Sequence, residues 1–155
     1  MWARIFFLTI IAIIKPIHAT ELSLRGTLQV INCSVNNSKP MDVSFGDAVG
    51  VNKVDGVRYL QPMPVEIICS QQTSGLLHLA FAGTPTDFDE AAIATNVNDL
   101  GIRLLQNDTP IVINQPLPLD ELYLPTFSAV PVKRPNSQLS GGSFTGLTTL
   151  LITLE

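Results

Sequence analysis

The chain has 155 residues, of which 14% are charged and 6% aromatic, with 11 Pro and 10 Gly. This length suits one domain and is short for two. Nine Lys and Arg against thirteen Asp and Glu give a net charge of −4, which argues against a nucleic-acid-binding protein, because such a protein needs a basic face to neutralise phosphates.

The first nineteen residues have the three parts of a secretory signal. An apolar run over Ile5–Ile14 follows a short basic start, and the segment ends at Ala19. A membrane-spanning helix needs about 20 apolar residues, but Lys15 and Pro16 interrupt this run. We therefore predict cleavage after Ala19 and no membrane anchor.

The two cysteines, Cys33 and Cys69, fit an exported protein. In an oxidising compartment they most simply form one disulfide. The bond would close the loop between the two cysteines and so stabilise the fold by about 3–4 kcal/mol. The alternative interpretation is a pair of buried free thiols.

Catalytic side chains are sparse in the exported product. Its one histidine, His78, lies in an apolar run, so a Ser–His–Asp or Cys–His arrangement is hard to build. The carboxylates Asp87, Asp89 and Glu90 lack the glycine and terminal glutamate of a calcium loop, and we interpret them as solvated loop residues. We expect no enzymatic activity, no cofactor and no metal site.

Strand signals dominate the chain after Ala19. Apolar and polar residues alternate over residues 20–31, and shorter apolar runs follow at 43–45, 65–69, 76–81, 100–105 and 111–113. Turns rich in Gly, Asn, Asp and Pro lie between these runs. Residues 87–98 favour a short helical turn or a loop. Five prolines between 116 and 135 predict loop and edge-type strand, since proline cannot donate to a central ladder.

The C-terminal segment, Ser143–Glu155, is predicted to be the longest regular element. One of its faces comprises Gly142, Phe144, Gly146, Thr148, Leu150, Ile152 and Leu154, and the other Ser143, Thr145, Leu147, Thr149, Leu151 and Thr153. Several short strands separated by turns predict an all-β sandwich. The alternating segment at the mature N-terminus needs a groove for its apolar face. It either folds onto its own domain or is donated to a neighbour, and periodicity alone leaves both open.

In order and spacing, these segments resemble the fimbrial subunits (pilins) of the chaperone–usher type. The residues that carry the resemblance are Leu22–Leu28 shortly before Cys33, Val43–Asp47 with Val54–Gly56, Val65–Cys69, Leu100–Leu104, and Gly142, fourteenth from the C-terminus, with Phe144 in its register. The family usually has an aromatic residue in the penultimate position, where this chain has Leu154.

The resemblance implies an all-β fold, an incomplete immunoglobulin-like β-sandwich completed by a donated strand. It divides the chain into a signal peptide (1–19), a donor-strand extension (20–31) and a pilin domain (32–155). The donor face would be Leu22, Leu24, Gly26, Leu28 and Val30. The acceptor groove and chaperone-facing strand would be Gly142, Phe144, Gly146, Thr148, Leu150, Ile152 and Leu154.

The resemblance also implies a function and a set of partners. The chain would be a structural minor subunit of a bacterial surface fimbria that supports cell adhesion. It would be exported through the periplasm and assembled with neighbouring pilin subunits, a periplasmic pilus chaperone and an outer-membrane usher, without nucleic acid or a membrane anchor. Two alternatives stay open: a major rod pilin of the same pathway, and a secreted, self-contained β-sandwich that binds carbohydrate.

Overall fold

The structure, a computed structural model, describes residues 25–26, 32–70, 77–120 and 123–154. These residues form antiparallel strands and two short 3₁₀ turns, without an α-helix in the described ranges, which confirms the all-β prediction. The strands are β1 (Cys33–Val35), β2 (Gln61–Met63), β3 (Ile67–Cys69), β4 (Leu77–Ala82), β5 (Ala92–Ala94), β6 (Leu100–Gln106), β7 (Thr109–Pro110), β8 (Leu117–Leu119), β9 (Phe127–Lys133) and β10 (Thr149–Leu154); the 3₁₀ turns are η1 (Asn36–Ser38) and η2 (Val51–Lys53).

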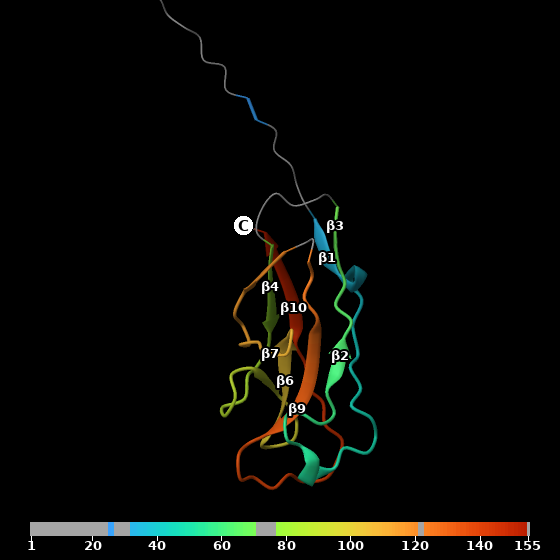
Figure 1. The fold of residues 1–155 in the computed structure, drawn as a ribbon, viewed down its shortest axis with the longest axis vertical. Helices are drawn as coiled ribbons and strands as arrows, with labels where there is room; N and C mark the ends of the chain where they lie inside the picture. Colours follow the sequence, from blue (N-terminus) through green and yellow to red (C-terminus); the bar gives the residue numbers. More distant parts are fainter. Residues whose placement is uncertain (1–24, 27–31, 71–76, 121–122, 155) are drawn as a thin grey trace, which may run out of the picture.

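The strands form three antiparallel sheets. One sheet has the order β2–β9–β6–β5, with β7 paired to β6; a second has the order β10–β4–β8; and β1 pairs with β3. In Figure 1 the long strands run roughly along the long axis, and β1 and β3 lie at the same end as the C-terminus. This arrangement brings the start of the described domain close to its last strand.

The core fills the space between the two larger sheets. Every second residue of β4 is buried, namely Leu77, Leu79 and Phe81, as expected for a strand with one face on a core. The Phe81 ring meets that of Phe127 on β9 edge to face, with 5.6 Å between centroids. Each such buried side chain contributes about 1.5–3 kcal/mol, so this contact joins the sheets.

Strand β9 corrects the prediction of loop and edge-type strand after residue 116. It lies between β2 and β6 although it contains Pro131. The physical reason is the length of β2, which pairs with β9 only as far as Ala129. Pro131 lies beyond that pairing, opposite Ile102 of β6, so its missing N–H costs no ladder bond with β2.

Three further local predictions need correction. Residues 87–98 contain β5, paired with β6, because Gly101 permits an approach so close that a Cβ there would meet Ala92 Cβ at 3.0 Å. Two predicted strands, 43–45 and 111–113, join no ladder among the described residues. The C-terminal strand is not the longest element, since β10 has 6 residues and β6 and β9 have 7 each.

The carboxylates of the acidic loop before β5 differ in exposure: Asp87 and Glu90 are exposed, as predicted for solvated residues, whereas Asp89 is half-buried. The Asp89 carboxylate accepts a hydrogen bond from Arg103 Nε at 2.7 Å and another from Ala91 N–H at 3.0 Å. Arg134 binds Asp87 and, at 2.6 Å, Asp99. Its guanidinium also lies 4.9 Å from the centre of the Phe88 ring. These pairs connect the loop to β6 and to the end of β9.

Replacing Asp87 with Asn should change how stability depends on pH. The hydrogen bond from Arg134 holds the pKa of the Asp87 carboxyl below its ordinary value of 3.8. The ion pair therefore stabilises the fold above that value and stops doing so as the pH falls through the lower, folded-state pKa. We expect the parent chain to have the higher unfolding midpoint at neutral pH and no advantage in strong acid. Unfolding midpoints that differ between the parent chain and the variant by the same amount at both pH values would contradict this. Asp108→Asn is the control variant.

Candidate functional site: an open groove beside the last strand

A groove of about 1290 Å³ opens between two segments that contribute little to the sheets. Residues 38–51 form its first wall and residues 139–150 its second. Its floor includes the core residues Met63, Ile93 and Leu104. The groove therefore reaches down to the core, whose residues at the floor are buried, and both of its walls come from stretches of chain that the sheets leave largely unpaired.

The second wall shows a strict alternation of exposure. From Phe144 to Ile152 the even-numbered residues are half-buried and the odd-numbered residues are exposed, with Leu147 82% and Leu151 49% exposed. Leu150 and Ile152 pack against the core. The wall thus turns inward the face on which the sequence places Phe144, Gly146, Thr148, Leu150 and Ile152.

The two ends of the predicted face differ from its middle. Gly142 is exposed and has a φ of +145°, which favours glycine. The C-terminal strand is shorter than predicted because residues 143–148 do not join the ladder with β4, which begins at Thr149. Leu154 ends β10, where it pairs with Leu77.

Strand β10 lies at the edge of its sheet. It pairs with β4 on one side, with Leu150 opposite Phe81 and Ile152 opposite Leu79. On its other side β1 lies close without forming a ladder, in the part of the chain that the structure describes. An edge of this kind presents N–H and C=O groups to any strand that approaches.

The first wall repeats the pattern of the second. Met41, Val43 and Phe45 are half-buried against the core, whereas the residues between them are exposed. The predicted strand at 43–45 therefore has the side-chain alternation of a strand but no partner. Phe45 also stacks on Phe144 of the opposite wall, with 5.8 Å between ring centroids. One aromatic contact thus joins the two walls.

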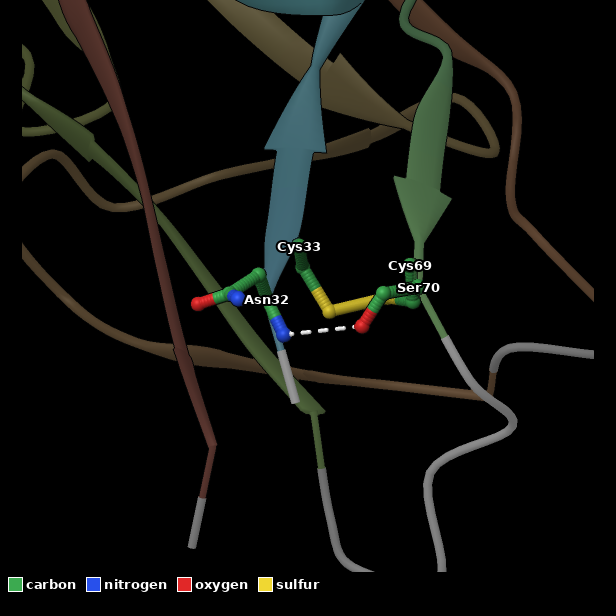
Figure 2. The surroundings of a disulfide bond; sticks show 4 residues. All are labelled: Asn32, Cys33, Cys69 and Ser70. Atoms are coloured by element: carbon green, nitrogen blue, oxygen red, sulfur yellow. Dashed lines mark hydrogen bonds between the residues drawn. A yellow bond between two sulfur atoms is a disulfide. The ribbon is translucent and has the colours of Figure 1, made fainter. Parts of the chain in front are cut away.

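A disulfide connects Cys33 to Cys69 and anchors the start of the first wall (Figure 2). The two cysteines are directly opposite each other in the β1–β3 ladder. Beside them, Asn32 N–H donates to Ser70 Oγ at 3.2 Å, and Ser70 N–H donates to the Asn32 carbonyl at 2.9 Å. The sequence predicted this disulfide. It lies in the two-stranded ribbon of β1 and β3, and β1 lies close to β10, which forms part of the groove.

Most of the predicted donor face lies outside the described residues, namely Leu22, Leu24, Leu28 and Val30. Gly26 is described and exposed, and a Cβ built on it would meet no heavy atom within 4 Å.

Outside the groove, the described residues include few side chains suited to catalysis or metal binding. His78 lies on β4 opposite Pro118 and Thr153, and its buried Nδ1 has no hydrogen-bond partner among the described atoms. Within the same ranges no group of His, Cys, Asp and Glu could hold a metal ion. A search of those residues finds no helix able to cross a membrane.

Removing the disulfide should weaken the fold. We expect the double variant Cys33→Ser/Cys69→Ser to lose about 3–4 kcal/mol in free energy of unfolding, because the bond closes a long loop in the unfolded chain. Urea titration of both chains, each with an excess of a peptide of residues 20–31 to fill the groove, would measure the loss, and reducing the parent chain should reproduce it. A variant whose midpoint equals that of the oxidised parent would show that the bond contributes nothing.

Comparison with known proteins identifies the family. The family model described as fimbrial protein matches residues 22–155. The uncharacterized fimbrial-like protein YfcQ of Escherichia coli K12 is 31% identical over 94% of this chain and 96% of its own length. The fimbrial adapter PapF of Escherichia coli is 25% identical over 88% of this chain and 87% of its own.

Solved structures agree with this result at the level of the fold. The P pilus adaptor subunit PapF superposes with a TM-score of 0.60 and 24% identity, over 79% of this chain and 95% of that one. The P pilus rod subunit PapA gives a TM-score of 0.63 and 16% identity, over 87% and 100%. The fold is thus the incomplete immunoglobulin-like sandwich of pilin subunits. The chain belongs to the fimbrial protein family, as a pilus subunit of the chaperone–usher type.

Proposed function

We propose that this chain is a minor, adaptor-type subunit whose groove accepts a strand from a partner and whose residues 20–31 form the strand given to the next subunit. One observation carries the proposal: an open groove runs along the inward face of residues 144–150 and reaches the free edge of β10 at its first residues, Thr149 and Leu150. This groove is the acceptor site, with Phe144, Gly146, Thr148 and Leu150 along one wall and Ile152 continuing the same face of β10 beyond it.

The physical need for a partner follows from this geometry. A groove lined by half-buried apolar side chains such as Val43, Phe45 and Leu150, next to a free strand edge, promotes aggregation unless something fills it. An added strand pairs with the edge and covers the apolar wall at once, and chaperone–pilin complexes are an established case of such addition. A periplasmic chaperone supplies the strand first, and the neighbouring subunit's extension replaces it at the outer-membrane usher.

The sequence of residues 20–31 suits the donor role. Leu22, Leu24, Leu28 and Val30 would insert into a neighbour's groove, each contributing about 1.5–3 kcal/mol when fully buried. Gly26, in the same register, permits a close backbone approach where a groove is shallow. The proposal divides the chain into signal peptide (1–19), donor extension (20–31) and pilin domain (32–155).

The adaptor role is favoured over the rod role by the relatives. The match to PapF, described as a fimbrial adapter, and to PrsF, described as a minor fimbrial protein, spans 88% of the chain in each case. In this role the chain joins other subunits at the cell surface and supports adhesion through them. Quantifying it in purified fimbriae tests the assignment, since a minor subunit stays far below the rod subunit.

Expression of residues 20–155 in a periplasm tests the need for a partner. Without a pilus chaperone we expect aggregated or degraded protein, because the groove stays uncovered. Co-expression with the chaperone should give a soluble heterodimer, detected by size-exclusion chromatography. A soluble, stable monomer obtained without chaperone or peptide would contradict the proposal and favour a self-contained sandwich.

Substitutions on the two faces of residues 20–31 test the donor role. Leu24→Asp places a charge on the inserted face and should prevent polymerisation while leaving chaperone binding intact. Ser23→Asp places the same charge on the opposite face and serves as the matched control. Polymerisation assays from purified chaperone complexes measure both. Equal polymer yields from the two variants would rule out the proposed register.

A further inference from the structure

The groove's second wall extends beyond β10, and something other than a sheet holds the extra part. Residues 143–148 precede β10 and lie outside its ladder with β4. They nevertheless follow an extended course with alternating exposure. In the described chain, their connections to the rest of the domain include an isolated antiparallel bridge between Gly146 and Thr95.

Asn96, in the turn after β5, makes three hydrogen bonds to this wall. Its backbone N–H donates to the Thr145 carbonyl at 3.2 Å. Its side-chain Nδ2 donates to the Ser143 carbonyl at 3.2 Å, and its Oδ1 accepts from Thr145 N–H at 2.7 Å. The side-chain amide thus reproduces on one residue the donor and acceptor of a neighbouring strand.

These bonds determine which way the wall's backbone faces. In an extended chain the N–H and C=O groups of successive residues point to opposite edges. Because Ser143 and Thr145 point toward Asn96, the backbone groups of Phe144, Gly146 and Thr148 point to the opposite edge, which faces the groove. Among the described residues, no backbone hydrogen bond occupies those three positions.

We propose that Asn96 is a positioning residue for strand acceptance. It holds residues 143–148 extended before a strand arrives and presents Phe144, Gly146 and Thr148 as a continuation of the β10 edge. Binding is stronger when this order is established in advance, since the arriving strand then orders less of the wall itself. This inference rests on the proposed strand-accepting function and adds to it the residue that builds half of the accepting edge.

The test uses the mature chain, residues 20–155, with an excess of a synthetic peptide of its own residues 20–31 as the strand. Amide hydrogen exchange is followed at single residues in the peptide complex. In Asn96→Ala we expect exchange at Phe144, Gly146 and Thr148 to rise about tenfold or more and exchange at Leu150 and Ile152 to change less than about twofold. Labelled peptide should also leave the complex faster.

Two further variants keep the test decisive. Asn98→Ala removes an exposed asparagine from the same turn and should behave like the parent. Asn96→Asp keeps the acceptor for Thr145 N–H but loses the donor to Ser143, so its effect should be smaller than that of Asn96→Ala. It is the variant to follow if Asn96→Ala does not fold.

Each outcome has one meaning. Exchange that rises equally at all five positions would show that Asn96 has only a general structural role and would overturn the inference. Variants of Asn96 indistinguishable from Asn98→Ala would do the same while leaving the proposed function standing. A parent chain that shows no protection at any of the five positions, either with the peptide or in its complex with a pilus chaperone, would overturn the proposed function and this inference together.

Discussion

The free edge of β10 is the constraint on which the rest of the structure depends. Register with β4 turns Leu150 and Ile152 toward the core, but one neighbouring strand covers only one edge and leaves those side chains half-buried. The walls that would flank a further strand are already formed, from 38–51 and 139–150. The domain is thus organised around a strand that it does not itself supply.

An open groove costs stability, and local features offset that cost. The Cys33–Cys69 bond ties β1 to β3, from which the first wall departs. On the other wall, Asn96 holds the stretch before β10. The Phe45–Phe144 contact joins the two walls. The disulfide and Asn96 lie outside the ladder that an arriving strand would use, so they hold the walls without obstructing the edge, whereas Phe45 and Phe144 belong to the walls themselves.

Period-two patterns predicted much of this organisation, because side-chain alternation reports which face is buried. The inward face from Phe144 to Ile152 follows from it directly, whereas apolar runs at 76–81 and 100–105 predicted β4 and β6. Alternation does not show which strands pair, however. Residues 43–45 alternate in exposure but join no ladder among the described residues. Proline rules also failed at Pro131, since the length of the neighbouring β2 decides whether an N–H is needed. Asn96 carried no signal, because its partners are 47 and 49 residues away.

The most direct measurement of the central claim is a structure of the mature chain with a bound strand, either the peptide of residues 20–31 or the chaperone's strand. The account predicts one added strand between Val43–Phe45 and Phe144–Ile152. It should hydrogen-bond to both walls and bury the half-exposed side chains of Leu150 and Ile152. A strand bound anywhere else, or a groove that closes on itself and stays empty, would contradict it.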